Sequence, residues 1–170
     1  MTAAGARPDV WICDFADADD RADFARLMAE FASEPVSASP QLESAHFDRV
    51  ADDLARRAGT LVLLAARPES ERTEGVLLAF EGYSSFARAA LFNIHDVHVS
   101  PAARGGGLGT AMVETLAELG REHRFAKITL EVAATNTGAI RLYRRLGFSG
   151  LDGLPLEAPA GATYFATRKL

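Results

Sequence analysis

Cysteine is nearly absent from this chain of 170 residues, which carries Cys13 alone. One thiol cannot form an intrachain disulfide, so a fold framed by disulfides is excluded. Long apolar runs are also missing, because the longest, 61–66 and 76–80, fall well short of the roughly 18 residues that cross a bilayer. The N-terminal stretch 1–10 lacks the basic start and the apolar run of a secretory signal. We therefore expect a cytoplasmic protein without a membrane partner.

The chain also lacks an excess of positive charge, because its formal net charge is -5. Residues 1–60 carry 12 acidic and 6 basic side chains, whereas residues 61–170 carry 11 and 12. No basic cluster is available to neutralise the phosphates of a duplex, so nucleic acid is not an expected partner either. The acidic first part has two interpretations: it keeps the protein soluble, or it forms a mouth that attracts cations.

Apolar residues, by contrast, make up 48% of the chain. This composition is typical of a globular domain, and a chain of this length usually builds one core. Between Phe24 and Phe31 the apolar residues follow the spacing of a helix, and between Ile128 and Val132 they alternate as in a strand. Loops are expected at 33–40 and 150–161. The expected strands cover 10–15, 60–66, 75–81, 89–99, 128–132 and 163–170, and the expected helices cover 19–32, about 47–54, 107–122 and 139–146.

The order of these elements predicts the fold class. The polar turn 67–74 has the length of an antiparallel hairpin connection. The strand, loop, helix and strand between residues 89 and 132 form a crossover unit, which leaves its two strands parallel. We expect a single α/β (α+β) domain over 1–170, with a mixed, mostly antiparallel sheet, a central parallel strand–helix–strand unit and flanking helices.

A glycine-rich loop follows the strand that ends at Val99. Unpaired backbone N–H groups and the positive end of the helix dipole converge at such a position, and glycine lets the backbone approach an anion closely. We therefore predict an anion-binding loop rather than a turn that merely starts a helix. The loop consists of Arg104, Gly105, Gly106, Gly107, Leu108, Gly109 and Thr110.

Two well-known phosphate-binding loops differ from this one. A nucleotide P-loop needs a lysine after its last glycine, and none stands there. The dinucleotide fingerprint G-x-G-x-x-G starts well at Gly105 and Gly107 but meets Thr110 in place of its third glycine, although Glu131 follows at roughly the expected 20 residues. An NAD(P)-dependent oxidoreductase therefore stays open as an alternative.

The loop resembles a signature of the GCN5-related N-acetyltransferases: arginine or glutamine, two residues, glycine, one residue, then glycine or alanine. The chain shows Arg104-Gly105-Gly106-Gly107-Leu108-Gly109, preceded by Val97-His98-Val99-Ser100-Pro101. A second stretch, Asn136 to Phe148, is similar to the family's asparagine, alanine, tyrosine and glycine-aromatic pattern. The resemblance spans about residues 76–148.

This resemblance implies that acetyl-CoA is the co-substrate and lies where the sheet splays apart, between the strands ending at Val99 and Val132. By the same likeness, backbone groups of Val97 and Val99 would pair with the pantetheine arm. Amides from Gly105 to Thr110 would hold the pyrophosphate, and Asn136 would bind the pantetheine region. Tyr143 would be the general acid for the departing thiolate, a role that suits a phenol.

These residues also have structural interpretations. Asn136 could cap the helix that follows it, and one residue can do both. Tyr143 could be a core aromatic, since it falls three residues after Ile140. Arg104 could be a solvated surface charge while the loop amides bind the phosphates.

A polar pair, His95 and Asp96, interrupts the apolar strand 89–99 at the point where its apolar alternation changes phase. A β-bulge would explain the change, and such a bulge is needed for both side chains to reach one site. Histidine titrates near the pH at which an amine must lose its proton, so His95 is the candidate base, directly or through water. The alternative is a structural histidine beside a stabilising aspartate, and His98 has the same ambiguity. His46 and His123 show no metal-ligand spacing, so no metal is expected.

Within the family the chain looks most like the branch that acetylates diamines, polyamines and thialysine-like amines. That likeness rests on the segments 80–86, 94–97 and 136–147, with His95 in place of a glutamate and Thr135 in place of an aromatic residue. It implies direct transfer of acetyl to a primary amine of a small molecule, in a ternary complex. The family is often dimeric, so a homodimer is a further expectation. The competing class is a non-catalytic module that binds acyl-CoA or another nucleotide.

Overall fold

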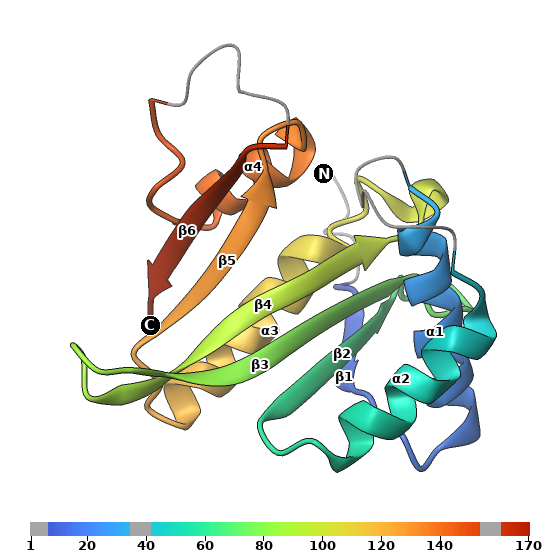
Figure 1. Ribbon diagram of the computed structural model, residues 1–170. Coiled ribbons are helices and arrows are strands. Elements are labelled where there is room, and N and C mark those ends of the chain that lie inside the picture. Colours follow the sequence, from blue (N-terminus) through green and yellow to red (C-terminus); the bar gives the residue numbers. More distant parts are fainter. Residues whose placement is uncertain (1–6, 35–41, 154–160) are drawn as a thin grey trace.

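The computed structural model describes residues 7–34, 42–153 and 161–170 (Figure 1). Most of the two expected loops, 33–40 and 150–161, lies outside these ranges. No helix of the described part has both the length and the apolar character needed to cross a bilayer. The strands are β1 (Asp9–Ile12), β2 (Thr60–Ala66), β3 (Gly75–Ser84), β4 (Ala89–Val99), β5 (Lys127–Ala133) and β6 (Thr163–Lys169), and the helices are α1 (Ala18–Ala32), α2 (Ser44–Arg56), the short 3₁₀ turn η2 (Pro101–Ala103), α3 (Leu108–Glu122) and α4 (Thr137–Arg145).

The six strands form one sheet in sequence order, β1 to β6. Every neighbouring pair is antiparallel except β4 and β5, which α3 connects as a parallel pair. This arrangement confirms the predicted mixed sheet with its central strand–helix–strand unit. The hairpin of β2 and β3 is also confirmed, although β3 continues to Ser84, beyond the predicted end at residue 81.

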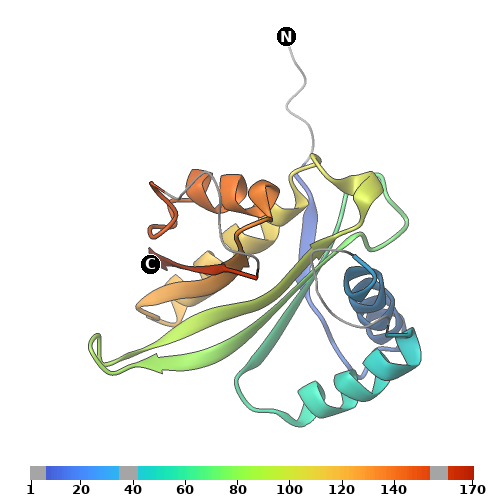
Figure 2. The same ribbon diagram turned by 45° about the horizontal axis from the view of Figure 1, so that its top comes forward.

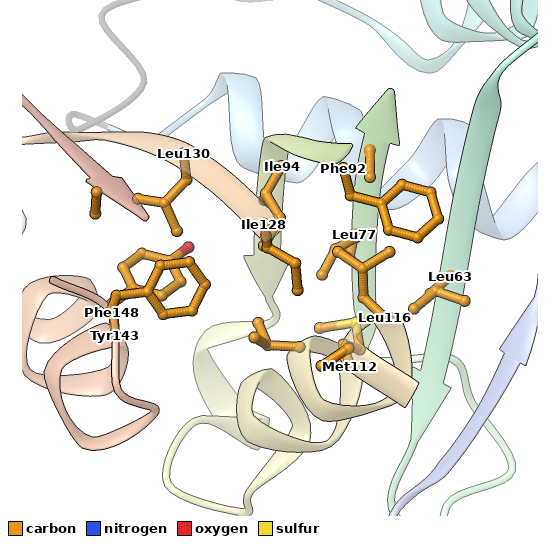
Figure 3. Close-up of a cluster of buried hydrophobic side chains, with 14 of the residues drawn as sticks. Leu63, Leu77, Phe92, Ile94, Met112, Leu116, Ile128, Leu130, Tyr143 and Phe148 are labelled. Atoms are coloured by element: carbon orange, nitrogen blue, oxygen red, sulfur yellow. The ribbon is translucent and has the colours of Figure 1, made fainter. Parts of the chain in front are cut away.

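Helices cover both faces of the sheet (Figure 2). The side chains of β2 show why, because Val62 and Leu64 face a core under α1 and α2, whereas Leu63 and Ala65 face the core under α3 and α4. A strand buried on both faces is apolar throughout rather than alternating. Figure 3 shows the core on the α3 and α4 side, which brings residues of β2 to β5 against both helices.

The first strand is shorter than predicted, since β1 ends at Ile12 and not at residue 15. The cause lies in aspartates that offer the backbone other partners. The Asp14 amide donates to the Asp20 carboxylate at 2.8 Å, and Asp17 caps α1 by accepting from the amides of Asp19 and Asp20. Short acidic side chains of this kind favour turns and helix starts over strand ladders.

Strands β4 and β5 are paired over a short stretch only. Their register runs from Phe92 opposite Ile128 to Ile94 opposite Leu130, yet both strands continue beyond it, to Val99 and Ala133. Figure 1 shows the two strands diverging toward their carboxyl ends. The sheet therefore splays apart at its centre, as the family resemblance implied.

Candidate active site

A cleft of about 890 Å³ opens where β4 and β5 separate. This volume lies within the range of about 300 to 1,000 Å³ that is usual for small-molecule sites. The end of α1, the second half of β4, the loop before α3, the end of β5 and α4 form its walls. All the site residues predicted from the sequence line this cleft, except Gly106.

The loop before α3 leaves several amides available. Gly107 is the N-cap of α3 and has no side chain to cap it, and it adopts a left-handed conformation with φ of 84°. Within the described ranges, the amides of Leu108, Gly109 and Thr110 donate to no acceptor. These amides at the start of a helix, with the helix dipole behind them, suit a phosphate.

Two glycines of the loop differ in their surroundings. A Cβ atom placed on Gly105 would meet nothing within 4 Å, so the backbone there is open to a ligand. A Cβ atom on Gly106 would lie 3.1 Å from the Ala103 oxygen, and the Gly106 amide already donates to that oxygen at 3.2 Å. Gly106 is thus turned toward its own loop, and the structure does not bring it to the cleft.

The guanidinium group of Arg104 is engaged by protein atoms. It donates to the carboxylate of Glu34, at the end of α1, and its Nε donates to the Val99 carbonyl at 3.0 Å. The Val99 carbonyl, which was predicted to face pantetheine, therefore has a partner within the protein. Arg104 is exposed, yet it is tied within the protein and joins the glycine-rich loop to the segment that follows α1.

Asn136 does cap α4, because its Oδ1 accepts from the Ala139 amide at 3.1 Å. The same residue lines the cleft, so capping and ligand binding are compatible. The cap also explains why α4 begins at Thr137, two residues earlier than predicted.

Tyr143 combines core packing with a place at the cleft. Its ring is 6% exposed and lies edge-on to Phe148, with the centroids 5.3 Å apart (Figure 3). Burial raises the pKa of the Tyr143 hydroxyl to about 12. The phenol therefore keeps its proton at neutral pH. A protonated phenol at this position can donate to a leaving group that becomes negative.

The predicted β-bulge in β4 is present. Leu78 of β3 is opposite Asp96, the next residue Ala79 is opposite Ile94, and His95 is the extra residue between them. Because of this insertion, Ile94 and Val97 both face the core under α3. The bulge therefore accounts for the change of phase seen in the sequence.

The bulge also brings His95 and Asp96 to one face of the sheet. The His95 ring lies edge-on to Phe80, with centroids 5.4 Å apart, and Phe80 packs with the core on the α1 and α2 side. Asp96 is opposite Leu78, which belongs to the same core. Both side chains thus reach the cleft from the α1 side, as a shared site requires.

Burial raises the pKa of the Asp96 carboxyl, and the neighbouring His95 opposes that shift. In the described ranges Asp96 makes no hydrogen bond or salt bridge that would compensate for its burial. A half-buried carboxylate without a partner is costly in a folded protein, and perturbed groups of this kind are frequent at functional sites.

His98 has a different position from His95. Its buried ring lies between a carboxylate of α1 and one just after that helix, with Nε2 3.5 Å from Glu30 and Nδ1 3.4 Å from Glu34. Burial lowers the pKa of His98, against the opposite effect of these carboxylates. The imidazole packs β4 against α1, which supports the structural interpretation of this histidine.

The single cysteine of the chain lies away from the cleft. Cys13 is buried outside the cleft lining, and its burial together with Asp20 raises its pKa to about 12. Since the thiolate is the nucleophilic form, this cysteine is inert at neutral pH.

Several residues of the cleft were not singled out from the sequence for this role. The sequence does not show which elements pack around the cleft, because that depends on the tertiary structure. It does show that two arginines stand four residues apart on one helix. These residues are Phe31 of α1, Glu34 just after it, Glu131 of β5, and Arg141 and Arg145 of α4.

Comparison with known proteins agrees with this geometry. A sequence model described as the Acetyltransferase (GNAT) family matches residues 23–148. The chain is 37% identical over 89 residues to a streptothricin acetyltransferase from Streptomyces lavendulae, covering 51% of this chain and 47% of that protein. It is 35% identical over 138 residues to a mycothiol acetyltransferase from Acidothermus cellulolyticus, covering 77% of this chain and 42% of that protein.

A solved structure shows the same fold. The NatC complex bound to Gag peptide and CoA contains a chain that superposes with a TM-score of 0.70 at 16% identity, covering 97% of this chain and 99% of that one. The present chain spans about half, or less, of the length of the curated relatives named above. The family model nevertheless covers most of its length, including the phosphate loop and α4. The chain belongs to the acetyltransferase (GNAT) family, whose members use acetyl-CoA.

Proposed function

We propose that this chain, as one acetyltransferase domain over 1–170, transfers an acetyl group from acetyl-CoA to a primary amine of a small molecule. One observation carries the proposal: a single cleft is lined by the start of α3, with its unpaired amides, and by Tyr143, His95 and Asp96. The amides suit the pyrophosphate, and Val97, Val99 and Asn136 line the same cleft.

The proposed reaction is direct attack in a ternary complex. His95 accepts the proton that the amine loses as its nitrogen bonds to the acetyl carbon. As the carbon–sulfur bond breaks, the Tyr143 hydroxyl donates to the sulfur, so the departing thiolate is neutralised. No covalent enzyme intermediate is needed, and the only cysteine lies outside the cleft.

The acceptor that fits this cleft is a cationic amine. Asp96 stands beside His95, and Glu131 of β5 also lines the cleft. Because Ile128, Leu130 and Val132 turn into the core under α3, Glu131 projects to the opposite face, the one that His95 and Asp96 share. Carboxylates on both sides of the split favour an ammonium group and disfavour an anionic acceptor.

These carboxylates support an acceptor of the kind used by the diamine-like branch that the sequence resembles, and we propose that acceptor class. The names of the relatives above refer to streptothricin, mycothiol and a peptide complex, so they point to more than one acceptor class. The choice rests on the two carboxylates, Asp96 and Glu131, that lie on the His95 face of the sheet in this cleft.

The test is a thiol-release assay with acetyl-CoA and a panel of acceptors: diamines and polyamines, neutral amines, amino acids, and peptides with free N-termini. We expect turnover with small cationic amines and little with neutral ones. Preferred turnover of peptides would overturn the acceptor class. Calorimetric binding of acetyl-CoA without turnover on any acceptor would instead favour a non-catalytic binding module.

The dependence of kcat on pH in this assay tests the role of His95. The variant His95→Gln should lose the rise of kcat with pH that deprotonation of a histidine produces, while its affinity for CoA stays unchanged. A pH profile of unaltered shape would remove His95 from the role of base.

A further inference from the structure

Coenzyme A carries more phosphate than the loop before α3 accounts for. Its diphosphate links the pantetheine arm to the nucleoside, and a separate phosphate monoester sits on the ribose 3′ oxygen. The free amides of Leu108, Gly109 and Thr110 are suited to one compact anion at the helix start. The monoester therefore calls for a second group of donors.

The cations of the cleft are not equivalent. Arg104 is held by Glu34 and by the Val99 carbonyl. Arg141 and Arg145 also line the cleft, and within the part of the chain that the structure describes neither makes a hydrogen bond or a salt bridge. Both side chains are exposed, so they stand at the mouth of the cleft rather than in its interior.

Helical geometry makes these two arginines a pair. They are four residues apart on α4, so they project from the same face of the helix in successive turns. The helix, Thr137–Arg145, contains no acidic residue that would neutralise them. The third arginine of α4, Arg144, points elsewhere and donates to the Leu151 carbonyl.

The helix that carries the pair lies against the phosphate loop. A Cβ atom placed on Gly109 would be only 3.2 Å from Cδ2 of Leu142, so the first turn of α3 packs closely on α4 (Figure 2). Arg141 is the neighbour of Leu142 in the sequence. A nucleotide whose diphosphate is bound at the start of α3 therefore has α4 beside it.

We propose that Arg141 and Arg145 bind the 3′-phosphate of coenzyme A and make the chain distinguish CoA from dephospho-CoA. This inference rests on the proposed function, because it takes acetyl-CoA as the co-substrate. A guanidinium pair suits a phosphate monoester, since each can donate two parallel charge-assisted hydrogen bonds.

The test is titration calorimetry of the full chain with CoA and with dephospho-CoA, without an acceptor. The wild-type protein should bind CoA about tenfold more tightly, the effect of a few charge-assisted hydrogen bonds at an exposed site. The double variant R141Q/R145Q should lose that preference and keep the wild-type affinity for dephospho-CoA. Each single variant should lose part of it.

The matched control for each single variant is Arg121→Gln, which removes one positive charge from the carboxyl end of α3, outside the cleft. It should keep the preference for CoA. Circular dichroism of each variant verifies that the fold is retained.

Other outcomes separate this inference from the proposed function. A double variant that binds both nucleotides equally more weakly would place the pair at the diphosphate and overturn the 3′-phosphate assignment. An unchanged preference in the double variant, or equal wild-type affinities for both nucleotides, would overturn it too. A wild-type chain that binds neither nucleotide would overturn the proposed function together with this inference.

Discussion

Arg104 of the glycine-rich loop donates a hydrogen bond to Glu34, which follows α1 and lies 70 residues earlier in the chain. Both residues line the cleft. Glu34 thereby satisfies the arginine that the sequence suggested for the phosphates. The ion pair also joins the segment after α1 to the loop before α3.

This pairing predicts a small effect of Arg104 on cofactor binding. The variant Arg104→Gln should weaken CoA by less than about tenfold, because the amides and not this side chain carry the phosphate contact. Glu34→Gln should tighten CoA binding slightly, by about threefold, since it releases the Arg104 guanidinium for the phosphates. Calorimetry measures both. In the double variant the gain should vanish, and a gain that persists would show that Glu34 acts independently of Arg104.

The phenol of Tyr143 should matter for turnover and not for binding. Tyr143→Phe keeps the ring that packs on Phe148 and removes the proton donor, so kcat should fall by about 10²-fold while the affinity for CoA stays within about twofold. Steady-state kinetics and calorimetry measure the two quantities. Tyr164→Phe on β6, outside the cleft, is the matched control and should keep its activity. An unchanged kcat in Tyr143→Phe would exclude the tyrosine from the mechanism.

Asp96 should make stability depend on pH in a defined direction. Burial raises its pKa in the folded state above that of the unfolded chain, so its contribution favours folding below the unfolded pKa and is lost as pH rises through the folded-state pKa. Asp96→Asn removes the charge that is costly at neutral pH. The Tm of the variant relative to wild type should therefore rise as the pH increases from below the unfolded-state pKa of an aspartate, about 3.9, through the raised folded-state pKa of Asp96.

Thermal unfolding across that range measures the difference. If Asp96 also holds the ammonium group of the acceptor, the same variant should raise KM for a diamine at neutral pH. A Tm difference that stays constant with pH would contradict the burial argument. An unaltered KM would separate Asp96 from acceptor binding.

The left-handed backbone at Gly107 predicts the effect of a single methyl group. Gly107→Ala strains a residue whose φ is 84° and adds a Cβ beside the amides of the helix start, so affinity for CoA should fall by about tenfold. Gly153→Ala is the matched control, because its φ of 66° carries similar strain and a Cβ there meets no atom within 4 Å. Both variants should lose similar stability, and only Gly107→Ala should lose CoA binding. Equal affinities in the two variants would contradict a role of the loop in phosphate binding.

Many local features of this protein could be predicted from its sequence, because they depend on neighbouring residues. The glycines of the loop, the cap at Asn136 and the change of phase at His95 are features of neighbouring residues, and backbone sterics and hydrogen bonding act at that range. They predicted the bulge in β4 and, to within one residue, the start of α3, and the cap at Asn136 was one of the two roles considered for that residue.

What the sequence left open depends on contacts between distant segments. The partner of Arg104 is Glu34, just after α1. Gly106 turns away from the cleft, and Glu131 shares the face of Asp96 only because β4 and β5 lie side by side. The pKa of Asp96 likewise follows from its burial, which packing sets. The sequence determined which elements form and where the backbone is exposed, whereas the tertiary structure decided which side chains share the cleft, because charge and burial depend on distances in space.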